Sequence, residues 1–355
     1  MESLDIRSAF KDKRILVTGH TGFKGSWLLT ILTELGSKVR GYSLPPEKNG
    51  LFDQIEGHLL CESVYGDILD KDKLNETILD YQPHYVFHLA AQSLVLKSYS
   101  QPNYTFEVNG IGTANLLMSL SKLKNECSIV IVTTDKVYEN EEQNHTFSEN
   151  DPLGGHDPYS ASKACAEIIT SSIRGSFFKN SNQYIATARA GNVIGGGDWS
   201  ENRLLPDIAR ALIDGDPIKL RNPNSVRPWQ HVLDPLYGYL RLAVMLNTGN
   251  EHFQGAYNFG PLSNDVFTVS DMSKLAVDCW GSGGIEISES QNAKKEAKYL
   301  SLDSRKANKG LQWEPKLSVE ESIKWTIDWY SNYANNNSSS LDYTKKQFSE
   351  YLRRL

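Results

Sequence analysis

The sequence predicts an α/β fold in which a doubly wound parallel sheet is joined to a smaller α/β lobe toward the carboxyl terminus. Short apolar runs alternate with longer amphipathic segments, which is the pattern of repeated βα units, and a glycine-rich turn follows the first run. With 355 residues, 39% of them hydrophobic, the chain can bury a large core. The expected strands cover residues 14–18, 38–42, 63–65, 85–89, 128–132 and 183–189.

Charge and cysteine content exclude several classes of protein. The net charge is −6, which argues against a general polyanion-binding surface and therefore against nucleic acid as a partner. Four widely spaced cysteines and eight histidines form no metal-ligand pattern, so we expect a reduced compartment and no metal. The amino-terminal segment is polar and no apolar run approaches the ~20 residues that span a bilayer, which predicts a cytoplasmic protein without membrane contact.

The turn at residues 19–25 reads GHTGFKG and joins an apolar strand to an apolar helix. Gly19, Gly22 and Gly25 match the three-glycine fingerprint of Rossmann-type dinucleotide-binding folds. The first glycine makes the tight turn, the second lets the backbone approach a pyrophosphate, and the third lets helix and strand pack closely. We therefore expect a dinucleotide at this turn. The contacting residues are expected to be Gly19, Thr21, Gly22, Phe23 and Lys24.

The choice between NAD and NADP is expected to depend on the end of the second strand. The carboxylate that binds the adenosine ribose in many such folds is absent, because residues 42–44 are Tyr, Ser and Leu. Ser43 could bond a ribose hydroxyl instead, whereas Arg40 could accommodate the 2′-phosphate of NADP. Between these alternatives we favour NAD.

Further cofactor contacts are expected after the third and fourth strands. Asp67, followed by Ile68, could reach the adenine or cap the next helix, and both alternatives stay open. Small residues after the fourth strand would let the backbone approach a flat ligand, although close helix packing would ask for the same residues. His88, inside that strand, is expected to be a hydrogen-bonded core histidine. The fourth-strand residues expected at the cofactor are Leu89, Ala90 and Ala91.

The stretch at residues 128–138, SIVIVTTDKVY, begins as a buried strand and ends in polar side chains. Open α/β sheets hold ligands at the carboxyl ends of their strands, so these side chains are expected to line a cleft. Tyr159 and Lys163 lie four residues apart at the start of a helix and share one face. A neighbouring ammonium favours the phenolate, so this pair could act as a base, or it could be a plain surface pair. The polar residues at the strand end are Thr133, Thr134, Asp135, Lys136 and Tyr138, and Thr133 is expected to contact the cofactor.

The pattern of the sequence changes after residue 190, from βα alternation to a glycine-rich loop and a helix. We expect a dinucleotide-binding domain at residues 1–190 and a substrate lobe at residues 191–334, parts of which return to the first domain. In the segment at residues 217–234, arginines beside aromatic residues and prolines could be solvated or could clamp a diphosphate. Residues 335–355 are expected to form a polar linker and a helical tail that contacts another subunit or frays.

Five motifs in order resemble the extended short-chain dehydrogenases/reductases that act on nucleotide sugars, the NAD-dependent epimerase/dehydratase family. The resemblance covers approximately residues 13–330 and is greatest to the CDP-glucose 4,6-dehydratases. It implies tightly bound NAD and conversion of CDP-glucose to CDP-4-dehydro-6-deoxyglucose and water, a step in deoxysugar biosynthesis for O-antigen or other surface polysaccharide. The motifs are GHTGFKGSWL, TTDKVY, GGHDPYSASKACAE, RAGNVIGGGDW and RPWQHVLDPL.

The resemblance also implies roles for the matching residues. Tyr159 removes the C4 hydroxyl proton, Lys163 holds the nicotinamide ribose and lowers the pKa of Tyr159, and Thr134 bonds the C4 oxygen. Asp135 protonates the departing C6 hydroxyl, which requires a raised pKa. The dTDP-glucose dehydratases have a glutamate base for C5 where this chain has Lys136, which could act as a base or as a cation that stabilises the enolate. The residues implied at the nucleotide diphosphate are Asn192, Arg203, Arg221, Arg227 and Tyr299.

Alternatives to this activity stay open. The chain could dehydrate another nucleotide hexose, or could be a 4-epimerase or reductase, which would need no acid such as Asp135 for C6. A non-catalytic dinucleotide-binding scaffold would need none of the catalytic residues. Tyr138 could take part in the reaction or pack in the core. By analogy with the family, we expect a homodimer or tetramer in which the helix begun by Tyr159 forms part of the contact.

Overall fold

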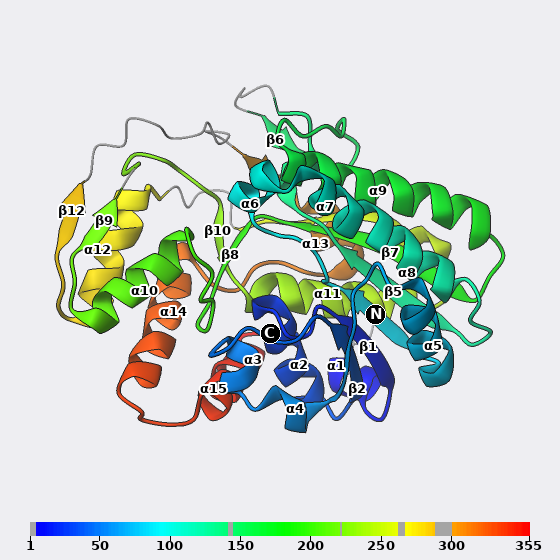
Figure 1. Cartoon of the computed structure of the whole chain (residues 1–355), viewed down its shortest axis with the longest axis horizontal. Coiled ribbons are helices and arrows are strands. Elements are labelled where there is room, and N and C mark those ends of the chain that lie inside the picture. The colour runs from blue at the N-terminus through cyan, green and yellow to red at the C-terminus, as the bar shows by residue number, and fades with distance from the viewer. Residues whose placement is uncertain (1–4, 141–144, 221, 262–266, 288–299) are drawn as a thin grey trace.

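A parallel sheet of seven strands forms the centre of the computed structural model, which describes residues 5–140, 145–220, 222–261, 267–287 and 300–355 (Figure 1). The strand order is β11-β7-β5-β4-β1-β2-β3, and each neighbouring pair is parallel. The expected doubly wound sheet is confirmed, with β11 as an additional edge strand. The strands are β1 (Arg14–Thr18), β2 (Lys38–Ser43), β3 (Glu62–Tyr65), β4 (Tyr85–His88), β5 (Cys127–Val132), β7 (Gln183–Ala190) and β11 (Gly255–Phe259).

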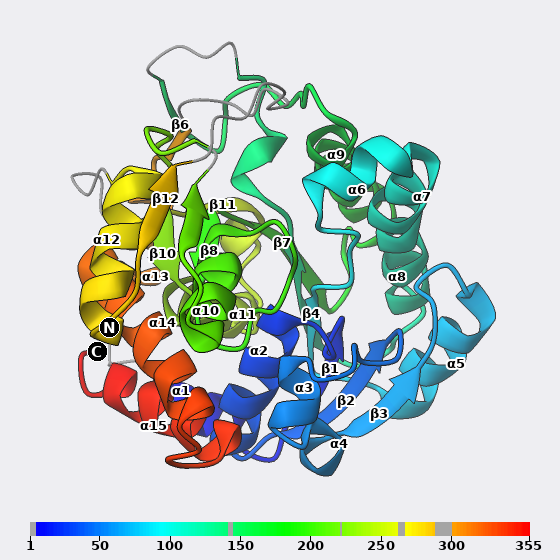
Figure 2. The same cartoon turned by 60° about the vertical axis from the view of Figure 1, so that its left-hand side comes forward.

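Helices cover both faces of this sheet, because alternate side chains of each strand point to opposite sides. In β1, Val17 belongs to the apolar cluster formed with α2 and α11, whereas its neighbour Leu16 belongs to the cluster formed with α5 and α8. Figure 2 shows these two pairs of helices on opposite sides of the sheet. The first helix of the chain, α1, is short and precedes β1. The covering helices are α1 (Ile6–Phe10), α2 (Phe23–Glu34), α5 (Lys71–Tyr81), α8 (Gly112–Leu120), α9 (Pro158–Phe177) and α11 (Leu233–Leu246).

The pattern at residues 103–123 suggests one long helix, but the structure interrupts it. The segment consists of α7 (Pro102–Phe106), a π-helical turn (Glu107–Ile111) and α8. Asn109 in this turn bonds to both backbone groups of Gln92 and to the hydroxyl of Ser162, at 2.8–3.0 Å. These buried hydrogen bonds stabilise the wider turn, a long-range effect that helix periodicity does not reveal. A short helix, α6 (Val95–Ser100), precedes it.

A smaller lobe is built from the chain after β7. Two short parallel pairs, β8 with β10 and β9 with β12, surround an apolar cluster with α10, α12 and α14 (Figure 1). The expected boundary between residues 190 and 191 stays a prediction. The elements of the lobe are β8 (Asn192–Ile194), α10 (Leu204–Asp214), β9 (Ile218–Leu220), β10 (Trp229–His231), α12 (Val269–Trp280), β12 (Ile285–Ile287) and α14 (Val319–Ala334). Other short elements are α3 (Leu51–Gln54), α4 (Gly57–Leu60), β6 (Thr146–Phe147), β13 (Ser301–Leu302), α13 (Arg305–Leu311) and the 3-10 turns Asp135–Val137 and Glu251–Phe253.

The carboxyl-terminal segment forms α15 (Ser340–Leu352), which packs on α2 and α14 of its own chain. Tyr351 is buried and donates to the carboxylate of Asp234 at 2.7 Å. Trp329 of α14 donates to Thr344 of α15 at 3.0 Å. The tail therefore joins the helix that follows the glycine turn to the smaller lobe, and the expectation that it frays is wrong for residues 340–352.

Candidate active site

The glycine turn has the geometry that a pyrophosphate requires. Gly19 has a φ of +74°, and a Cβ there would lie 2.6 Å from the backbone nitrogen of Ala90. A Cβ on Gly25 would lie 2.1 Å from the carbonyl oxygen of Gly19, so only glycine allows this close packing. A Cβ on Gly22 would meet only that oxygen, at 3.5 Å, and no side chain caps the start of α2. Open space and uncapped N–H groups at a helix start suit a phosphate ligand.

Thr21 and Ser43 lie together at the end of β2, where the sequence predicts the adenosine ribose. Their hydroxyl oxygens are 2.7 Å apart. Arg40 is already engaged elsewhere, in ion pairs with Glu62 at 2.8 Å and with Asp80 at 2.7 Å. Because both carboxylates hold its guanidinium, the alternative in which Arg40 accepts a 2′-phosphate loses its support.

Asp67 does not cap the helix that follows it. That cap is Asp70, whose side chain accepts the N–H of Lys73 at 3.1 Å. Asp67 instead accepts the N–H of Leu69 at 2.9 Å in the loop between β3 and α5, beside the buried Ile68. The capping alternative is therefore wrong, and contact of Asp67 with the adenine stays a prediction.

The residues after β4 lie against the glycine turn. Leu89 donates its N–H to the carbonyl of Thr18 at 3.0 Å, and Ala90 donates to the hydroxyl of Thr18 at 3.3 Å. The two ring nitrogens of His88 lie 2.7 Å from the hydroxyl of Thr18 and 3.1 Å from that of Thr113. Burial lowers the pKa of His88 to about 3. The prediction of a hydrogen-bonded core histidine is confirmed.

The carboxyl end of β5 brings an acid, a hydroxyl and an ammonium together. Asp135 is buried, and its Oδ1 accepts hydrogen bonds from Thr134 at 3.0 Å and from Lys136 at 3.4 Å. The other oxygen, Oδ2, has no partner within the described ranges and would be 3.0 Å from a Cβ on Gly191. Lys136 also donates to Asn192 of β8 at 3.2 Å, so the second lobe reaches this cluster.

Tyr159 and Lys163 are both buried on the first turns of α9. Burial raises the pKa of Tyr159, although the charge of Lys136 and a hydrogen bond with Thr134 act in the opposite direction. Lys163 donates to the carbonyl of Val132 at 3.1 Å, and burial lowers its pKa to about 8. The expected lowering of the pKa of Tyr159 is therefore not met, because burial dominates and the ammonium of Lys163 is directed at the strand.

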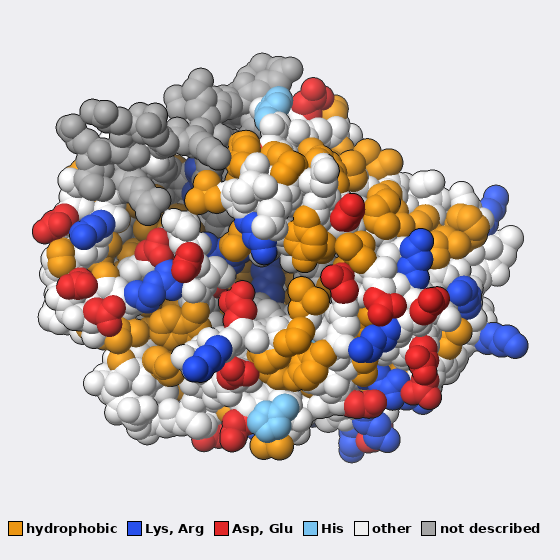
Figure 3. All heavy atoms as spheres, viewed as in Figure 1, with side chains coloured by type: hydrophobic (Ala, Val, Ile, Leu, Met, Phe, Trp, Pro, Cys, Tyr) orange, Lys and Arg blue, Asp and Glu red, His pale blue; other side chains and the backbone are white. Residues whose placement is uncertain are grey.

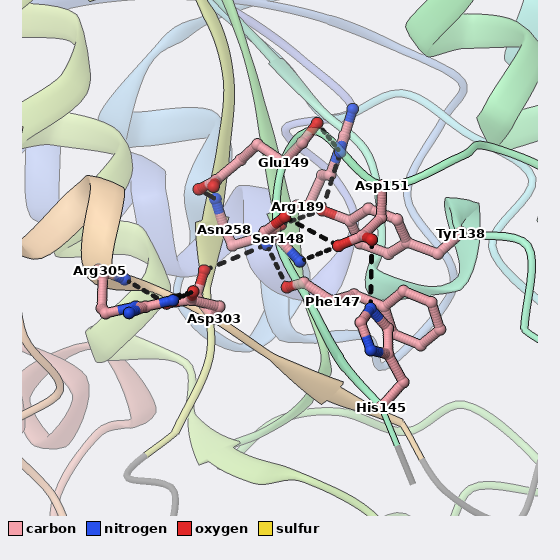
Figure 4. Close-up of polar contacts among 10 residues, drawn as sticks. All are labelled: Tyr138, His145, Phe147, Ser148, Glu149, Asp151, Arg189, Asn258, Asp303 and Arg305. Carbon is pink, nitrogen blue, oxygen red and sulfur yellow. Dashed lines mark hydrogen bonds and ion pairs between the residues drawn. The ribbon is translucent and has the colours of Figure 1, made fainter. Parts of the chain in front are cut away.

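Two of the predicted strand-end residues belong to a buried network beneath the site. The side chain of Thr133 donates to Glu167 at 2.5 Å, and Glu167 pairs with Arg189 at 2.9 Å. Arg189 donates to the phenol oxygen of Tyr138 at 2.8 Å, and Tyr138 donates to Asn258 at 2.7 Å (Figure 4). Burial raises the pKa of Tyr138 to about 12. For Tyr138, core packing is the alternative that the structure supports.

Sequence reasoning missed what the side chain of Lys24 does. Burial, together with the nearby charges of Arg203 and Lys163, lowers its pKa to about 7, and the charge of Asp135 opposes the shift. Its ammonium lies 6.0 Å from the ring centre of Tyr239, whose buried hydroxyl has no partner within the described part of the chain. The charges of Asp135, Lys136 and Lys163 therefore all act on Lys24, at the carboxyl end of β5. A lysine at the start of an otherwise apolar helix was the available signal.

On the side of the second lobe, Arg203 lies immediately before α10. It pairs with Asp198 at 3.1 Å and reaches the hydroxyl of Ser93, in the loop after β4, at 3.5 Å. Arg227 donates to the carbonyl of Val226 at 2.9 Å. Figure 3 shows a hollow between the lobes on this face of the molecule, with Lys or Arg side chains inside it. The predicted substrate residues that lie outside the described residues are Arg221 and Tyr299.

Two further observations concern metals and membranes. Within the described ranges, no group of three or more His, Cys, Asp or Glu side chains could hold a metal ion. None of the helices in those ranges combines the length and the apolar character that crossing a bilayer requires.

A glycine turn at the first βα junction and a Tyr-x-x-x-Lys pair beside the end of β5 define the class of short-chain dehydrogenases/reductases of the extended type. Within this class, the family model of GDP-mannose 4,6 dehydratase matches residues 16–326, and the chain belongs to that family.

Individual relatives agree with this family. The chain is 42% identical to the CDP-glucose 4,6-dehydratase of Salmonella typhimurium, over 98% of each protein. The structure superposes on the epimerase Mth375 of Methanothermobacter thermautotrophicus with a TM-score of 0.79 and 23% identity, covering 94% of this chain and 97% of that one. It matches DesIV, a dTDP-glucose 4,6-dehydratase of Streptomyces venezuelae solved with NAD and TYD, with a TM-score of 0.78, 22% identity and coverage of 91% and 98%. At these identities the two solved structures support the fold alone.

Proposed function

We propose that this chain is a nucleotide-sugar 4,6-dehydratase that converts CDP-glucose to CDP-4-dehydro-6-deoxyglucose and water, in deoxysugar biosynthesis. The observation that carries the proposal is the buried carboxyl of Asp135 beside Thr134 and Tyr159, in a chain 42% identical to a CDP-glucose 4,6-dehydratase. A 4-epimerase or a reductase needs no acid for the C6 hydroxyl. The Asp135–Lys136 pair therefore favours dehydration over these activities.

NAD is the proposed cofactor, and the turn that would hold it fits the group. The open space at Gly22 and the uncapped start of α2 suit the pyrophosphate, while Ser43 with Thr21 would meet the adenosine ribose. Asp67, Ile68 and the residues after β4 would line the adenine and nicotinamide ends. When bound, NAD supplies a hydride acceptor for C4 and a hydride donor for C6 of the sugar.

The side chains of the cluster divide the proton transfers among them. Tyr159 takes the proton of the C4 hydroxyl, and Thr134 bonds the same oxygen without competing as a base. The 4-ketone makes the C5 proton acidic, so a general base can take it and leave an enolate. Asp135 then gives its proton to the C6 hydroxyl, the C6–O bond breaks and water departs. Asp135 Oδ2 suits this role because it is buried and has no partner among the described residues. Lys163 would orient the nicotinamide ribose.

Lys136 is proposed to act as a cation in the elimination. Its ammonium donates to both Asp135 and Asn192, an arrangement that holds a positive charge where an enolate forms. Arg203 and Arg227 are proposed to bind the nucleotide diphosphate with Asn192, since guanidinium groups match phosphate oxygens in bidentate geometry.

The activity can be tested by incubating the protein and NAD with CDP-, UDP-, dTDP- and GDP-hexoses and measuring product masses. We expect CDP-glucose to lose one water. The variant Asp135→Asn is the control, because it keeps the size of the side chain and removes the acid. Loss of water from a non-cytidine substrate only would show that the nucleotide assignment is wrong, and an epimer of unchanged mass would show that the reaction is wrong.

We also propose that the chain forms a homodimer or a larger oligomer. Apolar side chains are exposed along α6, α7, the π-helical turn and α9, and orange side chains gather over these elements in Figure 3. An apolar surface across neighbouring helices suits self-association. Light scattering should detect a dimer or tetramer that Ile168→Glu with Phe177→Glu dissociates, whereas Leu59→Glu, at an exposed side chain of α4, leaves it intact. The exposed residues are Leu96, Tyr99, Phe106, Ile111, Ile168 and Phe177.

A further inference from the structure

We infer that Tyr330 and Asp198 are positioning residues that hold the guanidinium of Arg203 in place for the diphosphate of the substrate. The inference rests on the proposed function, because it takes Arg203 as a diphosphate-binding residue. It assigns a role in substrate binding to α14, a helix whose sequence suggests only a packed surface helix.

Arg203 spans the space between the two lobes. Its Nη1 lies 3.1 Å from Oδ2 of Asp198 in its own lobe, and its Nη2 lies 3.5 Å from the hydroxyl of Ser93 in the other. The side chain is 37% exposed, so a ligand can reach it. The charge of Arg203 acts to lower the pKa of both Tyr159 and Lys24, which agrees with its contact to Ser93 across the space between the lobes.

Asp198 is fixed on both its carboxylate and its backbone. It is buried, its Oδ1 accepts the N–H of Ser200 at 3.1 Å, and its Oδ2 receives Arg203. The hydroxyl of Tyr330, on α14, donates to the backbone carbonyl of Asp198 at 2.5 Å. Tyr330 is fully buried and its pKa is raised well above the ordinary value of tyrosine, so the hydroxyl remains a donor at neutral pH.

Side chains of α2 and α14 also contact the loop that carries Asp198. Trp27 of α2 donates its indole N–H to the carbonyl of Gly196 at 2.9 Å. A Cβ on Gly196 would lie 2.0 Å from the ring of Trp329, so the loop lies directly on α14. The ring of Trp199 packs edge-on against Tyr330, with ring centres 5.1 Å apart. Tyr330 is thus the point at which α14 fixes both the loop and the aspartate.

This arrangement explains how an exposed arginine can bind with little loss of side-chain freedom. A free arginine loses rotamer entropy when a ligand immobilises it. Asp198 holds one nitrogen of the guanidinium in advance, and the N–H groups that contact neither Asp198 nor Ser93 remain for phosphate oxygens. Removal of the Tyr330 hydroxyl would release the carbonyl of Asp198 and let the carboxylate, and with it Arg203, move.

The test is a double-mutant cycle between Tyr330→Phe and Arg203→Ala. The affinity for CDP, measured by calorimetry on the full chain, is the first readout, and KM and kcat for CDP-glucose are the second. We expect each single variant to weaken CDP binding about tenfold and to raise KM while kcat changes less than about threefold. The double variant should bind CDP no more weakly than Arg203→Ala alone, because Tyr330 acts through Arg203.

Tyr333→Phe is the matched control. The ring of Tyr333 packs on Trp199 and Trp329, but its hydroxyl makes no hydrogen bond to Asp198 within the described residues, so CDP affinity should not change. If Tyr330→Phe does not fold, Asp198→Asn takes its place in the cycle. NAD affinity should be the same in all variants, which separates repositioning of Arg203 from general damage.

Independent, multiplying losses in the double variant would overturn the inference, as would unchanged CDP affinity in Tyr330→Phe. A different result would contradict the proposed function. If the wild type does not dehydrate CDP-glucose but binds another nucleoside diphosphate, the same cycle is measured with that diphosphate. Coupling between Tyr330→Phe and Arg203→Ala in the binding of that diphosphate would support the positioning role, although the assignment of CDP-glucose as the substrate would be wrong.

Discussion

Lys136 contacts only one carboxylate oxygen of Asp135. The ammonium of Lys136 lies 3.4 Å from Oδ1 of Asp135, and Oδ2 has no partner in the described part of the chain. Thr134 donates to the same Oδ1 at 3.0 Å. Both neighbours therefore act on one oxygen, and the other is available to carry a proton toward the sugar. In the reaction that we propose, this geometry would separate the two functions that elimination requires, an acid at C6 and a cation near C5.

Replacing Asp135 and Tyr159 should separate oxidation from elimination. We expect Asp135→Asn to allow oxidation at C4 and to slow loss of water by about 10²–10⁴-fold, because the amide cannot protonate the leaving hydroxyl. Tyr159→Phe should block both steps. Rapid-quench detection of reduced cofactor would reveal the difference. Tyr138→Phe is the control, since its hydroxyl lies in the network with Arg189 and Asn258; equal loss of reduced cofactor in Asp135→Asn and Tyr159→Phe would contradict the division of roles.

Lys136 variants distinguish a cation from a base. If the ammonium stabilises the enolate, Lys136→Met should lower turnover about 10²–10³-fold, whereas Lys136→Arg keeps the charge and should lose much less. Exchange of the C5 proton with deuterated solvent, followed by mass spectrometry, should persist in Lys136→Arg. Equal loss of exchange in both variants would instead identify Lys136 as the base.

The two glycines of the turn should respond differently to alanine. At Gly22 a Cβ makes only an ordinary contact with the protein, so Gly22→Ala should fold normally and weaken NAD binding at least about tenfold by obstructing the pyrophosphate. At Gly25 a Cβ would collide with the carbonyl oxygen of Gly19, so Gly25→Ala should lower the melting temperature itself. Calorimetry and NAD titration of both variants provide the comparison. Normal NAD affinity in a folded Gly22→Ala protein would show that the pyrophosphate does not bind at Gly22.

Asp234 should make stability depend on pH. Burial raises the pKa of Asp234 to about 6 from the ordinary value of 3.8, despite hydrogen bonds from Tyr351 and from the N–H of Lys316. Because the folded pKa is the higher one, its stabilising contribution is complete below pH ~4 and is lost as pH rises through 6, an effect on the order of 3 kcal/mol. Asp234→Asn should abolish this loss.

The measurement is the difference in the free energy of unfolding between Asp234→Asn and wild type from pH 4 to 7, with the variant gaining as pH rises. Asp151 provides a control of opposite sign, because hydrogen bonds from Ser148 lower its pKa and its contribution is lost as pH falls. A constant difference between Asp234→Asn and wild type would refute the assignment.

Much of the fold is encoded locally. Strand and helix periodicity, and the glycine spacing, depend on residues within one or two turns of each other, so they predict the βα order and the dinucleotide turn. The site residues at the end of β5 and the start of α9 were predictable for the same reason, because parallel strands bring their carboxyl ends to one edge. The interruption of α7 and α8 was not, since Asn109 there bonds to Gln92 and Ser162.

The sequence by itself determined the order of elements, the glycine turn and the identity of the strand-end acid, because these follow from local periodicity and spacing. Only the tertiary structure decided which charged and phenolic groups meet. It paired Arg40 with two carboxylates, buried Tyr138 against Arg189, placed Lys24 near the charges of Asp135 and Lys163, and bonded Tyr330 to Asp198. Each of these contacts joins residues far apart in the chain, and burial and charge act on whatever packing brings together.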